Sequence, residues 1–195
     1  MIKMVKRCNW ASNDDRMRKY HDIEWGTPIH DDRLLFEFLI LEGAQAGLSW
    51  NTILQKRENF KVAFDNFDYN KIAKYNEQKV QKLMNNEGII RNRRKIEAII
   101  TNAKALLDVQ KEFGSFNKYI WKFVNNKTID NKFKELSELP SKTEQSEKMS
   151  KDLKKRGFKF VGPTICYAFM QAVGMVNDHV ISCFRYIEIK KSLNT

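Results

Sequence analysis

Proline and glycine are scarce in this chain: its 195 residues include three prolines and eight glycines. Folds built from many tight turns use both residues often, so their scarcity favours helices over a turn-rich β fold. Long apolar runs are missing as well, and no apolar segment follows the basic residues at the start of the sequence. We therefore expect neither a membrane span nor a signal peptide.

Cysteine is also rare, and its count of three is odd. Without an export signal, an odd number of cysteines argues against a disulfide framework. The thiols are then expected to stay reduced, which favours the cytoplasm as the compartment. Cys166 lies in an apolar segment and is predicted to be a buried core thiol, whereas His30 is predicted to lie in a surface loop.

Negatively charged residues are fewer than positively charged ones. The chain has 35 Lys and Arg against 24 Asp and Glu, which gives a formal net charge of +11. This excess favours an anionic partner, either a nucleic acid or an anionic membrane surface. The hydrophobic fraction of 42% is enough for a packed interior. We predict a single domain over residues 1–195, present as a monomer.

Apolar residues recur at helical spacing through most of the chain. Asp31 and Asp32 are good cap residues for a helix that is expected to end at Gly43. After a short connection over residues 44–47, a second helix is expected over about residues 49–58. The order of apolar and polar residues thus predicts helices from an early point in the chain.

The same spacing continues in residues 91–109 and again in residues 116–124. Residues 125–147 are polar and lack this periodicity, so they are expected to form a long loop. No alternation of polar and apolar residues is long enough to predict a sheet. The sequence therefore predicts an all-α fold.

Two pairs of metal-binding side chains stand near opposite ends of the chain. Cys8 and His21 come early, and His179 and Cys183 come late with H-x-x-x-C spacing, which on a helix places both side chains on one face. Four nitrogen and sulfur ligands are typical of a closed, tetrahedral, structural zinc site. We predict one structural Zn²⁺ per chain that ties the two ends together; the alternative is that His179 caps a helix without metal.

Residues from about 150 to 174 read as a helix–hairpin–helix. One helix is expected to end at Gly157, and the next to begin at Pro163. Gly162 would let backbone N–H groups at that helix start approach a phosphate of DNA, and Lys159 would add positive charge. Further positive charge comes from Lys154, Lys155 and Arg156. The alternative is an ordinary helical turn with a solvated basic face.

Five segments, taken in order, resemble the DNA-3-methyladenine glycosylase I family of bacterial alkylation-repair enzymes. They are residues 8–10 (Cys-Asn-Trp), 20–26 (Tyr-His-Asp-Ile-Glu-Trp-Gly), 41–50 (Leu-Glu-Gly-Ala-Gln-Ala-Gly-Leu-Ser-Trp), 154–164 and 176–180 (Val-Asn-Asp-His-Val). The resemblance implies a two-lobed, all-α fold of the helix–hairpin–helix superfamily. It implies a zinc ion held by the residues already named, and hydrolysis of the N-glycosidic bond of 3-methyladenine in alkylated double-stranded DNA, which leaves an abasic site.

A methylated adenine is cationic, so its pocket should offer a carboxylate and aromatic faces. Glu42 interrupts the apolar end of a helix, and a carboxylate buried there would need a partner of opposite charge. The resemblance implies that Glu42 and Tyr20 hydrogen-bond the base and that Trp50 stacks on it, with Trp10 in the same pocket. Alternatively, Glu42 could be an exposed helix-end residue and the tryptophans core residues; Trp25 is assigned to packing near the zinc.

The connection between the first two predicted helices suits a minor-groove contact. Gln45, Gly47 and Leu48 fall there, and a small apolar side chain on a tight loop can fill the gap left by a flipped base. We predict that Leu48 or Gly47 does so. The basic tail, residues 184–195, is left without an assigned role.

One residue departs from the wider superfamily. Many helix–hairpin–helix glycosylases carry a catalytic Asp in a V-D-x-H segment after the hairpin, but here Asn177 stands in that place and Asp178 is one residue further on. The chain also has no lysine at an obvious nucleophile position. This composition argues for labile, cationic substrates and against the excision of stable, neutral bases.

Two other functions compete with a glycosylase. A non-catalytic DNA-binding module would keep the hairpin and the zinc site, but it would have no use for a buried carboxylate beside aromatic rings. A membrane-surface protein would need the basic, amphipathic helix at residues 91–109 to expose its apolar side. Two observations therefore distinguish the three functions: whether Glu42 is buried beside aromatic rings, and whether the apolar side of residues 91–109 is exposed.

Overall fold

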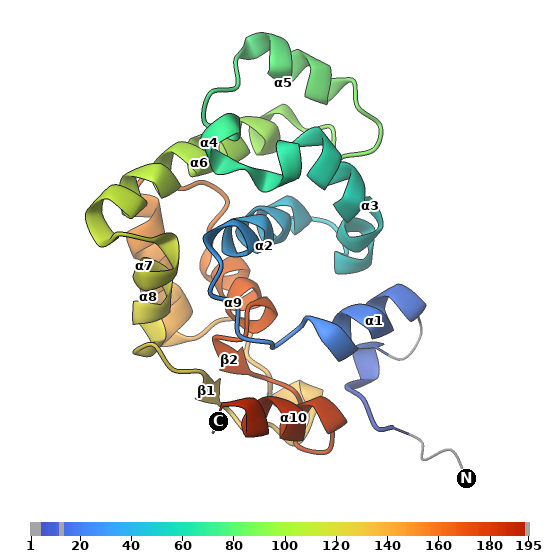
Figure 1. The fold of residues 1–195 in the computed structure, drawn as a ribbon. Helices are drawn as coiled ribbons and strands as arrows, with labels where there is room; N and C mark the ends of the chain where they lie inside the picture. The colour runs from blue at the N-terminus through green and yellow to red at the C-terminus, as the bar shows by residue number, and fades with distance from the viewer. Residues whose placement is uncertain (1–4, 12–13, 194–195) are drawn as a thin grey trace.

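The computed structural model describes residues 5–11 and 14–193, and its fold is mostly helical, as the sequence predicts (Figure 1). The helices are α1 (Asp15–Ile23), α2 (Asp32–Gln45), α3 (Trp50–Ala63), α4 (Tyr69–Ile72), α5 (Glu77–Met84), α6 (Arg93–Phe113), α7 (Phe116–Trp121), α8 (Glu144–Lys155), α9 (Pro163–Ala172) and α10 (Phe184–Ser192). Short 3-10 helices occur at Asn9–Ala11, Asp65–Phe67, Lys122–Val124 and Leu136–Glu138. Within the described residues, no helix is long and apolar enough to cross a membrane.

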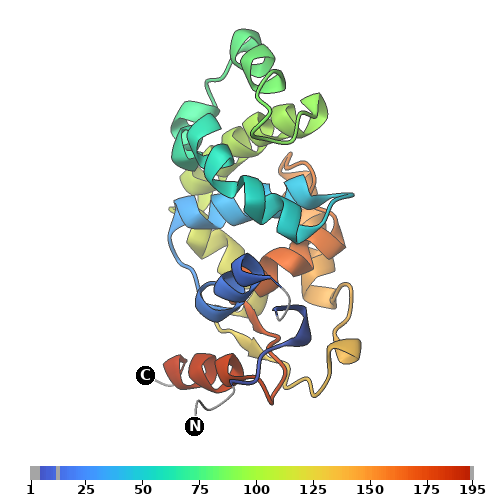
Figure 2. The same cartoon turned by 90° about the vertical axis from the view of Figure 1, so that its right-hand side faces the viewer.

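Helix α2 runs through the middle of the molecule, with α5 at one end and α10 at the other (Figures 1 and 2). Every residue of α2 from Leu35 to Ala44 is buried, against α3, α6, α7 and α9. A helix surrounded on all sides is apolar on all sides, which explains why residues 35–44 are apolar except at Glu37 and Glu42. A polar side chain in this helix is therefore an exception that needs a local partner.

The two predicted cap residues serve different helices. Asp31 caps α2, because its side chain accepts a hydrogen bond from the amide of Leu34 at 2.9 Å. Asp32 instead accepts hydrogen bonds from the amides of Phe116 (2.8 Å) and Asn117 (2.7 Å) at the start of α7. The predicted ends were also too early: α2 continues past Gly43 to Gln45, and α3 continues to Ala63. Gln45 is thus the last residue of a helix and not a loop residue.

The segment expected to be a long loop, residues 125–147, is attached to the rest of the fold by a strand pair that the sequence did not predict. Strand β1 (Ile129–Asp130) runs parallel to β2 (Val176–Asn177), with Ile129 opposite Val176. With two residues in each strand, no alternation of polar and apolar side chains can develop. The pair fixes the long segment beside the chain that leads to His179.

The predicted helix–hairpin–helix is confirmed as α8, a turn and α9. Gly157 has a positive φ of 91°, its amide donates to the carbonyl of Lys154 at 3.0 Å, and the amide of Phe158 donates to Leu153 at 3.0 Å. These two bonds end α8 in a Schellman motif, which favours glycine at the left-handed position. Pro163 is the first residue of α9, where the missing N–H has no helical partner to lose.

The apolar side of α6 lies in the core. Its buried residues include Ile96, Ile99, Ala103 and Leu106, so this helix has no exposed apolar stripe to place on a membrane. Part of the unassigned tail forms α10, which Figure 1 shows at the end of the molecule away from α5. The first four residues and the final two, Asn194 and Thr195, lie outside the described residues.

Candidate active site and metal-ligand cluster

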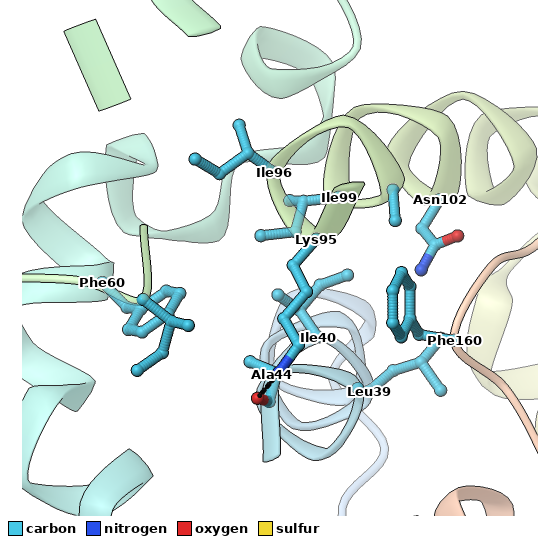
Figure 3. A pocket seen from close by; sticks show the side chains of 12 residues that line it. Leu39, Ile40, Ala44, Phe60, Lys95, Ile96, Ile99, Asn102 and Phe160 are labelled. Carbon is cyan, nitrogen blue, oxygen red and sulfur yellow. Dashed lines mark hydrogen bonds between the residues drawn. The ribbon is translucent and has the colours of Figure 1, made fainter. Parts of the chain in front are cut away.

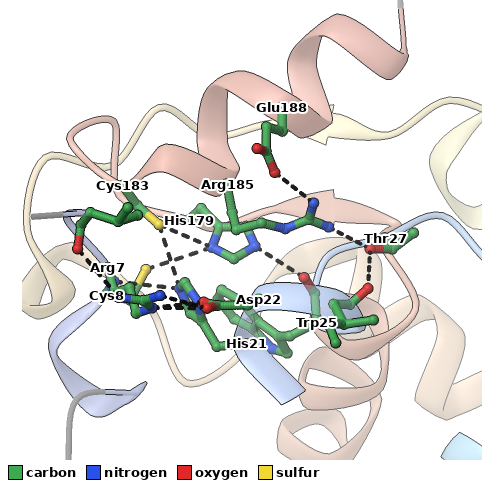
Figure 4. Close-up of polar contacts among 12 residues, drawn as sticks. Arg7, Cys8, His21, Asp22, Trp25, Thr27, His179, Cys183, Arg185 and Glu188 are labelled. Atoms are coloured by element: carbon green, nitrogen blue, oxygen red, sulfur yellow. Dashed lines mark hydrogen bonds and ion pairs between the residues drawn. The ribbon is translucent and has the colours of Figure 1, made fainter. Parts of the chain in front are cut away.

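Four predicted metal ligands meet in one buried cluster (Figure 4). Cys8, His21, His179 and Cys183 each offer one ligand atom, and these atoms all lie within 4.8 Å of one another. The Cys183 sulfur is 3.4 Å from Nε2 of His21 and 3.6 Å from Nδ1 of His179. Two thiols and two imidazoles suit a tetrahedral zinc site. The cluster could therefore hold a metal ion.

The remaining ring nitrogens of the two histidines have their own partners. Nδ1 of His21 lies 2.7 Å from the carboxylate of Asp22, and Nε2 of His179 lies 3.0 Å from the carbonyl oxygen of Trp25. Metal-binding histidines usually donate their second ring N–H to a carboxylate or a carbonyl, and this contact fixes the ring orientation. Arg7 holds the Asp22 carboxylate in turn, at 2.8 Å. The donor set and its surroundings fit a metal site.

The route by which the late pair of ligands converges differs from the prediction. His179 and Cys183 do not share a helix: the segment turns after His179, with the Cys183 amide bonded to the carbonyl of Val180 at 2.7 Å. Cys183 is the residue that precedes α10. The predicted helical face was wrong because a tight turn can bring residues four apart together as well as a helix can.

A cavity of about 280 Å³ lies beside the metal cluster, among α1, α2, α3 and α9. Its wall contains every residue predicted for the base pocket: Trp10, Tyr20, Glu42 and Trp50. The ring centroids of Tyr20 and Trp50 are 5.3 Å apart. Trp25, which was predicted to pack near the zinc, contacts the His179 ring at 4.6 Å between centroids and also lines this cavity.

Glu42 is one of two buried carboxyl groups in the apolar helix α2, and the other, Glu37, is paired with Arg57. Glu42 is 4% exposed, so the reading of this residue as a solvated helix end is wrong. Burial raises the pKa of its carboxyl group to about 8. Burial alone accounts for this shift: among the described residues, no hydrogen bond or neighbouring charge contributes to it. A buried carboxyl group without a cation favours a cationic ligand, which would pair with its ionised form.

Sequence reasoning missed four residues of the cavity wall: Met17, Leu139, Ala168 and Gln171. Leu139 comes from the long segment that was expected to be a loop, and nothing in its sequence indicates where it lies. Ala168 and Gln171 face the cavity from α9, whose apolar sequence indicated only a core helix. Their spacing of three residues is one helical turn, which is the single signal that could have linked them.

An ion-pair cluster joins three of the four helices that supply the cavity wall. Arg57 of α3 contacts Glu24 after α1 at 2.5 Å and Glu37 of α2 at 2.6 Å. The guanidinium group also lies over the ring of Phe38, 4.9 Å from its centroid. Arginine suits such a site because its planar group can bind two carboxylates and stack on a ring at once. The cluster fixes α1, α2 and α3 relative to one another.

Lys95 of α6 holds the end of α2, beside a small apolar cavity between these helices (Figure 3). Its ammonium group donates to the carbonyl oxygens of Ala44 at 2.7 Å and Ala46 at 2.8 Å. A helix C-terminus has unpaired carbonyl groups and a partial negative charge, so a cation is stabilising there. Lys95 thus positions the start of the segment that carries Gly47 and Leu48.

The predicted DNA-contacting residues lie on two adjoining surfaces. Leu48 is 40% exposed, and with Gln45 and Gly47 it lines a shallow depression that continues to the first turns of α9. On the hairpin, Asn102 of α6 pairs with both backbone groups of Lys159, at 2.7 and 3.0 Å. A Cβ atom built on Gly162 meets nothing within 4 Å. Any need for glycine there would come from a bound partner and not from the protein itself.

Arg156 does not add free charge to the hairpin. It forms hydrogen bonds with Glu112 at 2.6 Å and Asp152 at 3.1 Å, and it lies over the rings of Phe113 and Tyr119. These contacts join α8 to α6 and α7. The charge of Arg156 is therefore paired within the protein, whereas Lys154, Lys155 and Lys159 of the hairpin are exposed.

The structure places Asn177 and Asp178 away from the cavity wall. Asn177 is fully buried in β2, and its side-chain amide donates to the carbonyl of Tyr186 at 3.4 Å. Asp178 is 1% exposed and accepts hydrogen bonds from three neighbours. Neither residue lines the cavity.

A buried carboxyl group stands among aromatic rings, next to a hairpin whose second helix begins without a capping side chain. Residues 10–186 match the methyladenine glycosylase family, and the chain belongs to that family. It is 50% identical to DNA-3-methyladenine glycosylase 1 of Escherichia coli, over 93% of this chain and 97% of that protein. Identity to a DNA-3-methyladenine glycosylase of Haemophilus influenzae is also 50%, over 92% and 97% of the two chains.

The solved structures that are similar to this chain are also 3-methyladenine DNA glycosylases. A crystal structure of 3-methyladenine DNA glycosylase I matches with a TM-score of 0.90 and 50% identity, over 92% of this chain and 98% of the other. The enzyme from Staphylococcus aureus, whose structure concerns 3-methyladenine recognition, matches with a TM-score of 0.89 and 37% identity, over 91% and 95% of the two chains. The resemblance seen in five sequence segments is confirmed over nearly the whole chain.

Proposed function

We propose that this protein hydrolyses the N-glycosidic bond of 3-methyladenine in alkylated double-stranded DNA and leaves an abasic site. The observation that carries the proposal is the buried, unpaired carboxyl group of Glu42 in a cavity walled by tryptophan and tyrosine. Methylation makes the base cationic and a good leaving group. The protein then needs to extrude the nucleotide, bind the base and stabilise its charge.

Each residue of the cavity has its own role in binding the base. Glu42 pairs with the cationic base as a carboxylate, and Tyr20 hydrogen-bonds the base from α1. Trp50 stacks on the base, which is favourable for a cation once water is excluded; Trp10 and Trp25 close the aromatic wall. Asn177 is buried and does not line the cavity, so it is not placed to activate water there. The glycosidic bond of the methylated base is labile, so its cleavage does not need an aspartate that activates water.

DNA is held on the two surfaces next to the cavity. We assign the phosphate backbone to Lys159 and to the backbone amides that follow Gly162 at the start of α9, where the helix dipole favours an anion. Gln45, Gly47 and Leu48 enter the minor groove beside the flipped nucleotide. The formal net charge of +11 supports DNA as the anionic partner.

One zinc ion is the metal that the donor set favours. Bound by Cys8, His21, His179 and Cys183, it would fix the fold and take no part in bond cleavage. We further propose a two-lobed helix–hairpin–helix enzyme that forms a single domain, acts as a monomer and works in the cytoplasm. The three free cysteines, all buried, suit a reducing compartment.

The proposed activity is tested by the release of free bases from N-methylated duplex DNA, separated by chromatography. We expect release of 3-methyladenine without release of 7-methylguanine. A folded, metal-loaded protein that binds DNA but releases no base would instead be the non-catalytic binding module. The buried carboxyl group argues against that module, since a protein that only holds DNA has no use for it.

Leu48→Ala is expected to lower excision by about 10-fold, because the shorter side chain cannot fill the gap left by a flipped base and the base returns to the stack more often. Single-turnover excision from a duplex with one 3-methyladenine measures the effect. Val62→Ala, at an exposed residue near the end of α3 that does not line the depression, is the matched control. Unchanged excision and DNA affinity in Leu48→Ala would contradict the proposal that Leu48 fills the gap left by the flipped base.

A further inference from the structure

A second cavity, of about 460 Å³, has no role in the proposed chemistry. Three segments that are far apart in the sequence form its wall: residues 6–9, residues 134–137 and the turn at residues 180–182. The wall is polar, unlike the aromatic wall of the base cavity, which is the one that Glu42 and Trp50 line. We call the second cavity the lysine cavity, after its residues Lys6 and Lys134.

Positive charge is in excess on the wall of the lysine cavity. Lys6 and Lys134 are exposed, and neither forms an ion pair with a described residue. Arg7 also lines the cavity, but its guanidinium group is bound to the carboxylate of Asp22 at 2.8 Å. Glu135 is the one acidic residue among the described residues of the wall. Two ammonium groups are therefore available to an anion.

Backbone hydrogen bonds hold the three segments together. The amide of Phe184 donates to the carbonyl of Lys6 at 3.0 Å, and the amide of Ile181 donates to the carbonyl of Phe133, next to Lys134, at 2.8 Å. Both lysines are thus attached through their backbones to the same turn before α10. The cavity is formed before a ligand arrives, which reduces the cost of ordering on binding.

The lysine cavity adjoins the base cavity. Asn9 lines the first and Trp10 the second, and likewise Ser137 lines the first and Leu139 the second. The base cavity in turn shares three residues with the depression that leads to the first turns of α9: Glu42, Gln45 and Ala168. No described residue lines both that depression and the lysine cavity. The base cavity therefore lies between the lysine cavity and the hairpin side.

We infer that the lysine cavity binds backbone phosphates of the DNA, at the edge of the base cavity away from the hairpin; the inference rests on the proposed function. A phosphodiester group has a negative charge and oxygens that accept hydrogen bonds, so it pairs with the ammonium groups and with the hydroxyls of Ser137 and Ser182. Phosphates recur about every 3.4 Å along the axis of each strand. A duplex held at the hairpin thus presents further phosphates beyond the base cavity.

DNA is then held on both sides of the nucleotide that leaves the stack. Lysine binds phosphate as a point charge on a flexible stem, and such contacts fix the position of the duplex without any preference among bases. The lysine cavity should therefore contribute to the binding of DNA and leave the binding of the free base unchanged.

The test is the salt dependence of binding to a duplex with one abasic-site analogue, measured by fluorescence anisotropy. Each phosphate that a lysine neutralises contributes about 0.9 to the slope of log affinity against log salt concentration. Lys6→Gln combined with Lys134→Gln should lower the size of that slope by about 1.8 and weaken binding about 10-fold at about 0.1 M salt. Lys6→Arg combined with Lys134→Arg keeps the charge and should keep the slope.

The matched control removes the same charge elsewhere. Lys74 and Lys82 are exposed, they lie after α4 and within α5, and neither lines the base cavity, the depression or the lysine cavity. Lys74→Gln combined with Lys82→Gln should leave the slope unchanged. An equal loss of slope in this control would mean that net charge alone is responsible, and the inference would be wrong.

Two further outcomes separate the possible ligands and the two proposals. Inorganic phosphate is a second probe: if it protects the wild-type protein but not the Gln variant from thermal unfolding, while both bind DNA with the same slope, the cavity binds a small anion and the inference is overturned. If the wild-type protein releases no 3-methyladenine but the Gln variant still loses slope, the phosphate contact stands and the proposed glycosylase activity alone is wrong.

Discussion

Glu42→Gln is expected to lower the excision of 3-methyladenine by about 100- to 1000-fold. The substitution keeps the shape of the side chain but removes the negative charge that would face the cationic base, and an electrostatic contact in a water-excluded site has an effect of this size. Single-turnover excision from alkylated duplex DNA measures it. Glu58→Gln, at a carboxylate on α3 whose side chain is 82% exposed, is the matched control and should leave the rate unchanged.

The same substitution should stabilise the folded protein at high pH. Burial raises the pKa of Glu42 to about 8 from an ordinary value of 4.5. Below pH 4.5 the group is protonated in both states, so it does not alter the free energy of unfolding. As the pH rises toward 8, the unfolded chain loses the proton and the folded chain keeps it, and this difference destabilises the fold by up to about 4 kcal/mol.

Urea denaturation of wild type and Glu42→Gln at pH 5 and pH 8 measures this effect. The stability of the variant relative to wild type should increase between the two pH values, while the exposed control Glu58→Gln should show no such change. A constant difference would show that the carboxyl group ionises normally. Loss of activity together with a gain in stability would identify Glu42 as a residue placed for binding a cation at the expense of the fold.

Removal of the metal is expected to be the largest change in stability. Structural zinc contributes a large part of the folding free energy of small metal-binding proteins. Cys183→Ser should retain less than one metal ion per chain and lose about 5 kcal/mol, which lowers Tm by roughly 10–20 °C for a chain of this length. Metal analysis and thermal unfolding of the purified protein measure the two quantities.

A buried cysteine outside the cluster provides the control. Cys166→Ser changes the same atoms in α9, where the thiol donates to the carbonyl of Val161 at 3.4 Å, and it should retain its metal. Full metal content and unchanged stability in Cys183→Ser would contradict the metal site. Loss of metal in both variants would mean that unfolding, and not the removal of a ligand, is responsible.

Much of this site could be predicted because its residues break the local pattern of the sequence. Glu42 is a charge within an apolar helix, and the Cys and His pairs stand out in a chain with three of each. Gly157 and Pro163 carry their own conformational preferences, so the hairpin followed from sequence. Such features depend on neighbouring residues, which a sequence displays directly.

The remaining features depend on contacts between distant segments. Asp32 caps α7 and not its own helix, because the start of α7 packs beside it. Arg156 looks like a DNA-binding residue until its partners Glu112 and Asp152 are known. Leu139 and Gln171 reach the cavity from segments with no local signal for it. No periodicity in a single sequence specifies these pairings.

The metal cluster also has a consequence for the time at which the enzyme matures on the ribosome. Cys8 and His21 leave the ribosome early, but their partners His179 and Cys183 are made near the end of the chain. At the usual rate of synthesis, the early pair waits roughly 10–35 s for the late one. Trp10 and Tyr20 flank the early ligands, so we expect this part of the cavity wall to be fixed only after the late pair has been made. A chain broken off before Cys183 would lack one of the four ligand residues.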